Sequence, residues 1–328
     1  MKNTIKPKLL PFVGRFAIIH LIAYTAIVYG FLLYQQNLPE SNRIGLDLYQ
    51  QFHTLSLTTI LGQLLRGLAF GFVFYPFYDL VFERKGGKLL LFLSMWAVGL
   101  IGSVEPQPGS IEGIIYTIIS FTEHTSVIIA IALQMAIFVG LAFGVENFIN
   151  GKRAVKTGKL FLPYSDTIKG YIIRFVAVHL FTYWVVGGIF YEISGYNQAL
   201  ESMEIFALWR PLENLNAVLL VFFGQIFRGT MLALLLYPFY RTYIVTKRGW
   251  ALLYLLMVGL TILGSPLFLT EFIAFEGSTA EFFKSLTMGI PEIISQMLVF
   301  SLLFFYWQKK AETKQMKVLQ YNMSIFLT

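Results

Sequence analysis

The sequence contains no cysteine, so disulfide bridges, thiol catalysis and cysteine-based metal sites are excluded. It also lacks the short motifs of zinc proteases, serine hydrolases and P-loop nucleotide-binding proteins, and its aspartates and histidines form no ligand cluster. These absences predict no catalytic residue, no metal site and no cofactor. An enzyme that acts on lipid is the least favoured of the functions weighed below.

Charged side chains are scarce. They make up 13% of the 328 residues, whereas a soluble domain usually has about 25%. Hydrophobic residues make up 56%, and several apolar runs reach the roughly 20 residues that a helix needs to cross a bilayer. The first apolar run is too long for a signal peptide and has no clear small-residue cleavage site after it. We therefore expect a membrane protein whose first span lies near the N-terminus.

Eight apolar runs define the expected spans. They cover residues 16–35, 56–81, 88–104, 125–148, 173–193, 216–240, 250–267 and 288–307. The fold class that follows is an all-α polytopic membrane protein with about eight transmembrane helices.

Basic residues gather on one side of these spans. The N-terminal segment, the loops after the second, fourth and sixth spans, and the C-terminal tail hold most of the 25 lysines and arginines. Because basic loops stay in the cytoplasm, we expect both termini to be cytoplasmic and the chain to lie in the plasma (cytoplasmic) membrane, with the lipid bilayer as a partner. These loops explain the net charge of +7, and no pattern indicates nucleic acid.

Two stretches far apart in the chain are similar. Gly62–Tyr78 and Gly224–Tyr240 share eight of their seventeen residues, and Arg15–Leu21 resembles Arg174–Leu180. The similarity predicts two tandem, like-oriented four-helix repeats related by a pseudo-two-fold axis along the membrane normal. The expected organisation is a first repeat at 1–149, a basic cytoplasmic linker at 150–170, a second repeat at 171–310 and a cytoplasmic tail at 311–328.

An arginine occupies the same place in each repeat, near the centre of a span. Arg66 lies about ten residues into its span, roughly 15 Å deep. Such an arginine is costly in a membrane and must face protein or water. Glutamines accompany both arginines at a similar depth, and together they predict a substrate-binding constellation. Its members are Gln63, Arg66 and Gln134 in the first repeat and Gln225, Arg228 and Gln296 in the second.

Two roles stay open for these arginines. With amides but no carboxylate at their depth, they suit an anion or a lipid phosphate; alternatively, they are structural pins bonded to glutamines and backbone carbonyls. Glu112 or Glu123 reaches that depth only if its loop folds back into the membrane. Glu292, one turn before Gln296, is the best acidic candidate.

The two Tyr-Pro-Phe-Tyr segments and two histidines are predicted near the cytoplasmic face, in gating or interface roles. Proline kinks a helix, and tyrosine suits a membrane interface. The histidines are expected to hydrogen-bond the tyrosines, with proton coupling as the alternative. The residues concerned are His20, Tyr75, Pro76, Tyr78, His179, Tyr237, Pro238 and Tyr240.

The outer loops carry further signals. After Pro108, a row of isoleucines falls on one helical face and Ser110 can cap the helix start. This pattern predicts a helix that lies on the outer membrane surface or re-enters the membrane. The long polar loops at 36–55 and 194–215 are expected to form a small outer cap.

Two classes of function follow. The favoured one is a transporter or channel in which two like-oriented halves enclose a path for a small anionic solute or a lipid headgroup. The alternative is a membrane scaffold, assembly or regulatory protein that binds a protein partner through its outer loops. In that alternative, the arginines only lock each four-helix unit.

Overall fold

The structure is a computed structural model that describes residues 6–39, 57–103, 108–151, 166–202, 209–210, 215–262 and 279–326. These residues are helical apart from short turns and one isolated bridge between Thr117 and Trp209. Six helical segments are long and apolar enough to cross a membrane. The chain is therefore a multi-pass, all-helical membrane protein.

The first half (residues 1–149) contributes three of these six segments. They cover Leu9–Ile27, Thr59–Phe82 and Phe121–Asn150. The elements are α1 (Leu9–Tyr24), the π-helical turn η1 (Thr25–Tyr29), α2 (Gly30–Gln36), α3 (Leu57–Phe74), the 3-10 turn η3 (Tyr75–Phe77), α4 (Tyr78–Phe82), α5 (Gly87–Leu93), the π-helical turn η4 (Ser94–Val98), α6 (Gly99–Ile101), α7 (Ile111–Tyr116) and α8 (Phe121–Asn150).

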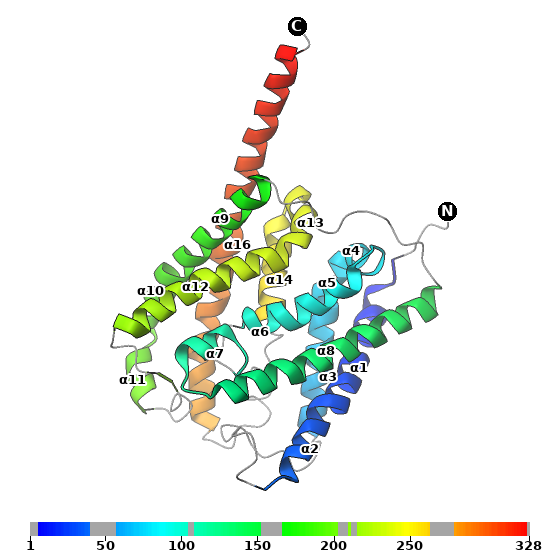
Figure 1. The fold of residues 1–328 in the computed structure, drawn as a ribbon, viewed down its shortest axis with the longest axis vertical. Helices are drawn as coiled ribbons and strands as arrows, with labels where there is room; N and C mark the ends of the chain where they lie inside the picture. Colours follow the sequence, from blue (N-terminus) through cyan, green and yellow to red (C-terminus); the bar gives the residue numbers. More distant parts are fainter. Residues whose placement is uncertain are drawn as a thin grey trace.

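The second half (residues 171–310) contributes the other three segments. They cover Ile168–Ile193, Leu215–Val245 and Thr287–Lys314, and the first of them begins a few residues before position 171. The elements are α9 (Asp166–Phe181), the π-helical turn η5 (Thr182–Val186), α10 (Gly187–Ile193), α11 (Tyr196–Ser202), α12 (Leu215–Leu236), the 3-10 turn η7 (Tyr237–Phe239), α13 (Tyr240–Val245), α14 (Gly249–Thr261) and α16 (Thr279–Phe326). α1 begins and α16 ends at the upper side of Figure 1, and α16 continues well beyond the bundle.

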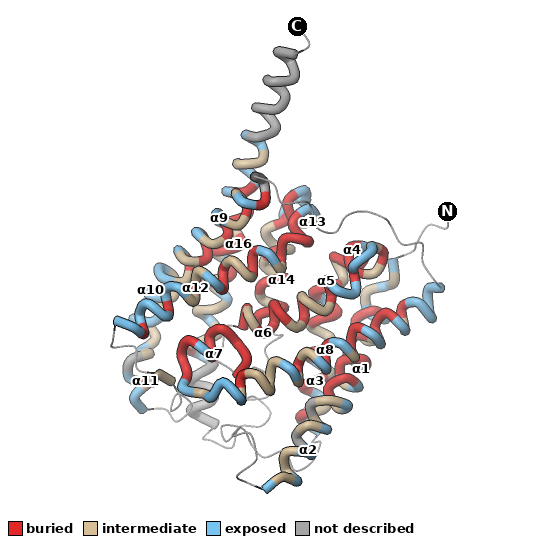
Figure 2. The backbone as a smooth tube through the Cα atoms, viewed as in Figure 1, coloured by how far each residue is buried: buried red, intermediate tan, exposed pale blue. Residues whose placement is uncertain are grey.

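The prediction of eight spans is not confirmed. The expected third and seventh spans are the helices Gly87–Ile101 and Gly249–Thr261, which are shorter than the other six. Both lie in the middle of the view in Figure 2, and most of their residues are buried or half-buried. Because protein rather than lipid surrounds much of their length, these two helices need not match the thickness of the bilayer.

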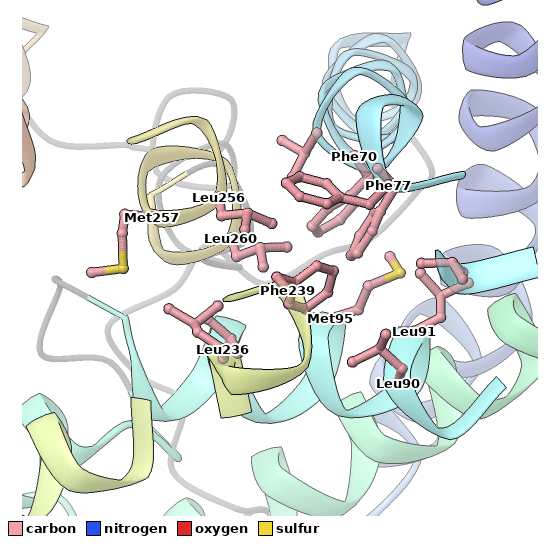
Figure 3. Packing of buried hydrophobic residues seen from close by; sticks show 14 of the residues in the cluster. Phe70, Phe77, Leu90, Leu91, Met95, Leu236, Phe239, Leu256, Met257 and Leu260 are labelled. Carbon is pink, nitrogen blue, oxygen red and sulfur yellow. The ribbon is translucent and has the colours of Figure 1, made fainter. Parts of the chain in front are cut away.

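The core joins the two halves. α14 packs on α3 of the first half, and η4 packs on α12 of the second half. Figure 3 shows side chains of both halves in one cluster, among them Phe77 and Met95 from the first half with Phe239 and Leu256 from the second. The rings of Phe77 and Phe239 meet edge to face with centroids 5.0 Å apart. Each half thus completes the core of the other.

Small residues permit the closest helix contacts. A Cβ atom at Gly67 would lie 2.6 Å from Cα of Ala17, so α1 and α3 touch backbone to backbone. A Cβ atom at Gly259 would lie 2.0 Å from a methyl group of Val73, where α14 crosses α3. Such approaches are the usual means of helix association in membranes, where lipid removes the hydrophobic driving force.

Within the described ranges, three π-helical turns interrupt the helices of the bundle. η1 follows α1 and η5 follows α9, so the same irregularity occurs in the first helix of each half, and η4 lies in one of the short central helices. A π-turn widens the helix locally and is often retained at functional sites.

The linker prediction at 150–170 falls largely on residues outside the described ranges, as do most of the loop at 36–55 and part of that at 194–215.

Candidate functional site

Arg228 lies in the middle of α12 and is 5% exposed. Its Nη1 donates to Oε1 of Glu112 at 2.5 Å and contacts Oε1 of Gln225 at 3.3 Å. Its Nη2 donates to the backbone carbonyls of Gly102 and Ser103, at 2.9 and 3.0 Å. These carbonyls follow α6, where a helix end carries partial negative charge. The guanidinium is therefore neutralised by one carboxylate and one helix terminus.

The expectation that no carboxylate lies at the depth of the arginines is wrong for Arg228. Its partner is Glu112 and not Glu292, because the segment after Pro108 folds back beside α12. Of the two predictions for this segment, re-entry is the one that places Glu112 at an arginine in the middle of a span. The ion pair also crosses between the halves, since Glu112 belongs to the first and Arg228 to the second.

The local structure of α7 explains how Glu112 reaches its place. Gly109 has a φ of +86°, which a residue with a side chain rarely adopts, and Ser110 caps α7 by accepting from the backbone N–H of Gly113. Ile115 packs on Gly224, where an added Cβ would lie 2.3 Å from its terminal methyl carbon. A larger residue at position 224 would push α7, and Glu112 with it, away from α12.

The end of α7 is fixed by a segment of the second half. Thr117 forms an antiparallel bridge with Trp209, and the ring of Tyr116 stacks on that of Trp209 with centroids 5.9 Å apart. Arg210 donates its backbone N–H to the Tyr116 carbonyl and a side-chain N–H to the Thr117 carbonyl. The segment after α7 in the first half and the segment before α12 in the second half are therefore joined here.

Gln225 connects the arginine to a histidine. Its Oε1 lies 3.1 Å from Nε2 of His179, and its Nε2 donates to Glu112 at 3.0 Å. Since Gln225 Oε1 accepts, Nε2 of His179 carries the proton in this arrangement. His179, Gln225, Arg228 and Glu112 form one buried network, which is called the second-half network below.

The first half repeats part of this arrangement. Nε2 of His20 lies 3.0 Å from Oε1 of Gln63, as His179 does from Gln225. Gln63 is 1% exposed and Arg66, one turn further on α3, is 4% exposed. Arg66 acts electrostatically on Tyr24, which lies one turn beyond His20 on α1. The predicted neighbours Gln63 and Arg66 are thus buried on the face of α3 that meets α1.

Gln134 is the third residue predicted for the first-half site. It lies on α8, one turn from Phe138, whose ring is 6.0 Å from that of His20. Gln134 is 2% exposed, and its Nε2 has no hydrogen-bond partner. Nδ1 of His20 is also buried without a partner. Buried polar atoms are nearly always satisfied in proteins, so each of these two atoms requires an explanation.

Gln296 is the counterpart of Gln134 in the second half, and its amide has a partner. Its Nε2 donates to Oε1 of Glu292 at 2.8 Å, on the preceding turn of α16. Gly187 lies against this pair: a Cβ atom there would be 2.8 Å from Nε2 of Gln296 and 3.4 Å from Oε1 of Glu292. In the first half the residue one turn before Gln134 is Ala130, so no carboxylate is available from that position.

Tyr116 is within electrostatic reach of both Glu112 and Glu292. Burial is the main cause that raises the pKa of its phenol above the usual value, and the charges of Glu112 and Glu292 raise it further. Its hydroxyl is hydrogen-bonded to Gln225. Tyr116 therefore remains neutral. Because Glu292 acts on Tyr116, which is bonded to Gln225, Glu292 lies close to the second-half network.

The predicted hydrogen bond between the histidines and the Tyr-Pro-Phe-Tyr segments is wrong. Both histidines bond to glutamines instead. Tyr78 donates to Oε2 of Glu146 at 2.7 Å, and Tyr240 accepts from Nε2 of Gln308 at 2.8 Å. The glutamines that hold the histidines precede Tyr78 and Tyr240 by 15 positions on the same helical segments, which is about four helical turns.

The tyrosines belong to a second pair of matched clusters, at the other end of the bundle. Arg15 donates to Glu146 through Nε and Nη2. At the same place in the second half, Arg174 donates to Gln308 at 2.6 Å. The first-half cluster therefore contains an ion pair where the second half has an arginine bonded to a neutral amide.

The remaining residues of the two Tyr-Pro-Phe-Tyr segments are also placed. Tyr75 donates to the Pro7 carbonyl at 3.1 Å, whereas the Tyr237 hydroxyl is buried without a partner. Pro76 and Pro238 each lie in a 3-10 turn, η3 and η7, that interrupts the helix. The gating role of these residues stays a prediction.

Sequence reasoning missed Glu112 as the arginine partner, and Glu146 and Gln308 altogether. Glu146 and Gln308 were detectable, because they are 162 positions apart, as are Gln134 and Gln296. No group of three or more histidine, aspartate or glutamate residues suited to a metal ion occurs in the part of the chain that the structure describes. Comparison with protein-family models, curated proteins and solved structures gave no match.

Proposed function

We propose that this membrane protein is a transporter, built from two like-oriented halves, that binds a small anionic solute or an anionic headgroup at the polar residues of its first half. The site consists of Gln134 on α8, with Gln63 and Arg66 on α3 and His20 on α1. All four side chains are at most 4% exposed. Ionisable residues inside a membrane are expensive, and they usually mark the path of a solute or ion.

One observation carries this proposal. The buried amide nitrogen of Gln134 has no partner, whereas its counterpart Gln296 donates to Glu292. In the second half, the chain itself supplies a carboxylate to the matched amide, since Glu292 accepts from Gln296. A solute with a carboxylate or another anionic acceptor would supply to Gln134 what Glu292 supplies to Gln296. This contrast between the two halves supports an anionic ligand for the first half.

The electrostatics of the first half suit an anion. The charge of Arg66 acts on Tyr24, which lies one turn from His20 on α1, so the positive potential extends to the α1 side of the site. Attraction of an anion by a cation is strong where water is scarce, because the effective dielectric constant is low. A donor from the amide of Gln134 adds a hydrogen bond to the charged form of the ligand, of the kind worth about 1.5–3 kcal/mol.

The test is thermal melting of the purified protein in detergent against a panel of anions. The panel holds halides, inorganic phosphate, short carboxylates and phosphatidylglycerol in mixed micelles, so that free solutes and headgroups are distinguished. A ligand at 100 times its Kd stabilises the folded state by about 2.7 kcal/mol, which raises Tm by roughly 4 °C for a chain of 328 residues. We expect this shift in the wild type and its loss in Gln134→Leu.

Arg241→Gln is the matched control, because Arg241 is an exposed arginine on α13 and its variant should respond to the ligand like the wild type. If no anion shifts the wild type, solute binding at Gln134 is refuted. The scaffold function then gains support, and chemical crosslinking at the segment around Trp209 would be the next experiment.

A further inference from the structure

Glu292 and Glu112 have different neighbours. Glu292 lies in the span Thr287–Lys314, five positions from the start, and it is partly exposed. Its recorded partners are the amide of Gln296 and the hydroxyl of Tyr196. Glu112, in contrast, is paired with Arg228. Among the described side chains, none supplies a positive charge to Glu292.

The groups around Glu292 can be traced element by element. α11 supplies Tyr196, on which Tyr191 of α10 stacks. α7 supplies Glu112 and Tyr116, and η5 and α9 lead to His179, which is bonded to Gln225. α14 contains no charged residue. The nearest cation on α12 is Arg228, whose Nη atoms bond to Glu112, Gln225 and two carbonyls.

A carboxylate inside a membrane with hydrogen bonds but no cation has two ways to reduce its cost. It takes up a proton, or it binds a cation. A metal cation needs about six oxygen ligands, whereas the oxygens placed here are those of the carboxyl group and one phenol. The local set is therefore sufficient for a proton and insufficient for a metal ion.

We propose that Glu292 is a proton-binding site of this protein, at which the carboxyl group takes up and releases one proton within the membrane span. The protonated carboxyl retains one oxygen to accept from Gln296. The other oxygen carries the proton and can donate a hydrogen bond to the hydroxyl of Tyr196. Release leaves the anion held by the amide and the phenol, and repelled by Glu112.

Its position couples Glu292 to the rest of the site. Glu292 lies near Glu112, which holds Arg228, so a negative charge at Glu292 adds a second carboxylate beside a single arginine. Like charges at close range oppose each other. Protonation of Glu292 therefore favours the observed pairing of Glu112 with Arg228, and deprotonation opposes it. That a proton moves with the solute is an extension that rests on the proposed function; proton binding itself does not.

The test is labelling with dicyclohexylcarbodiimide, a hydrophobic reagent that reacts with protonated carboxyl groups in membranes. The full chain is treated in detergent across a series from mildly acidic to alkaline pH, and peptide mass spectrometry assigns the modified residue. We expect modification at Glu292 that declines at least tenfold as the pH rises. Glu112 should stay unmodified, because its carboxylate is held charged in the ion pair.

Glu292→Gln should lose the modification, and Glu192→Gln, at an exposed position on α10, should retain it. If Glu292→Gln does not fold, the wild-type pH series decides alone. The proposal is overturned if Glu292 is unmodified in mildly acidic buffer, or if its modification is independent of pH. It is also overturned if sodium, but not choline, slows the reaction at fixed pH, because the site then holds a metal cation. None of these readouts requires transport, so a failed solute screen leaves them unaffected.

Discussion

The ion pair between Glu112 and Arg228 should be one of the strongest determinants of stability in this protein. Both side chains are buried, at 5% relative exposure for each residue, and they join a re-entrant segment of the first half to a helix of the second. Replacing Glu112 by glutamine removes the negative charge but keeps the shape and one acceptor. Arg228 would then remain charged, with only neutral partners among its recorded contacts.

Removing one partner of a buried pair typically costs about 3–5 kcal/mol. For a chain of 328 residues, 1 kcal/mol corresponds to about 1.5 °C in Tm, so Glu112→Gln should melt roughly 4–7 °C below the wild type. Arg228→Gln should melt lower by a similar amount, since it leaves the carboxylate of Glu112 buried without a cation. The assay is thermal melting in detergent, followed by intrinsic fluorescence.

The double variant measures the coupling between the two side chains. Because each single change disrupts the same pair, the double variant should lose less than the sum of the two, with a coupling of at least about 1 kcal/mol. Glu192→Gln and Arg241→Gln alter an exposed acid and an exposed arginine and should stay within about 0.5 kcal/mol of the wild type. Strictly additive losses, or single losses no larger than those of the controls, would refute the assignment of a buried, coupled pair.

Three further variants follow from the same contacts. Glu146→Gln should lower the free energy of unfolding by about 1–2 kcal/mol less than Glu146→Ala in melting experiments, because Gln308 makes the matching hydrogen bonds in the second half. Equal losses for the two variants would contradict this. Gln134→Leu should stabilise the ligand-free protein by about 1–3 kcal/mol, since it removes a buried amide nitrogen without a partner, and a large loss of Tm would show that the amide is satisfied. Gly67→Ala should cost about 1–3 kcal/mol, because its Cβ would meet the backbone of α1, whereas Gly14→Ala, where the space is open, should cost less than about 0.5 kcal/mol.

Much of the membrane architecture is readable from the sequence, because an apolar run of sufficient length is a physical requirement for crossing lipid. Six of the predicted runs coincide with span-length helices. The two that are shorter are the central helices. Neighbouring helices bury much of their length, and this tertiary packing cannot be predicted from an apolar run alone. The tandem repeat stays a prediction, although the two His–Gln contacts and the two Arg–Glu/Gln contacts occupy matching sequence positions.

The site was predictable only in part. The burial of Gln63, Arg66, Gln225 and Arg228 follows from the high cost of a polar group facing lipid. The partner of Arg228 did not follow, because the path of the segment after Pro108 depends on tertiary contacts such as that of Ile115 with Gly224. The expected His–Tyr contact failed for a related reason. Depth along two separate helices was estimated from soft span boundaries, and an error of a few turns changes every partner.

The proposed solute site depends most directly on whether position 134 can be reached from solution. Since the chain has no cysteine, Gln134→Cys introduces a single thiol, which can be tested with a small membrane-impermeant thiol reagent in vesicles of both orientations. Phe138→Cys, one turn away at a fully buried position, is the closed control, and Arg241→Cys is the open one. The account predicts labelling at position 134 from at least one side and its slowing by the anion that raises Tm. Labelling at 134 no faster than at 138 from either side would contradict a solute path through the first half.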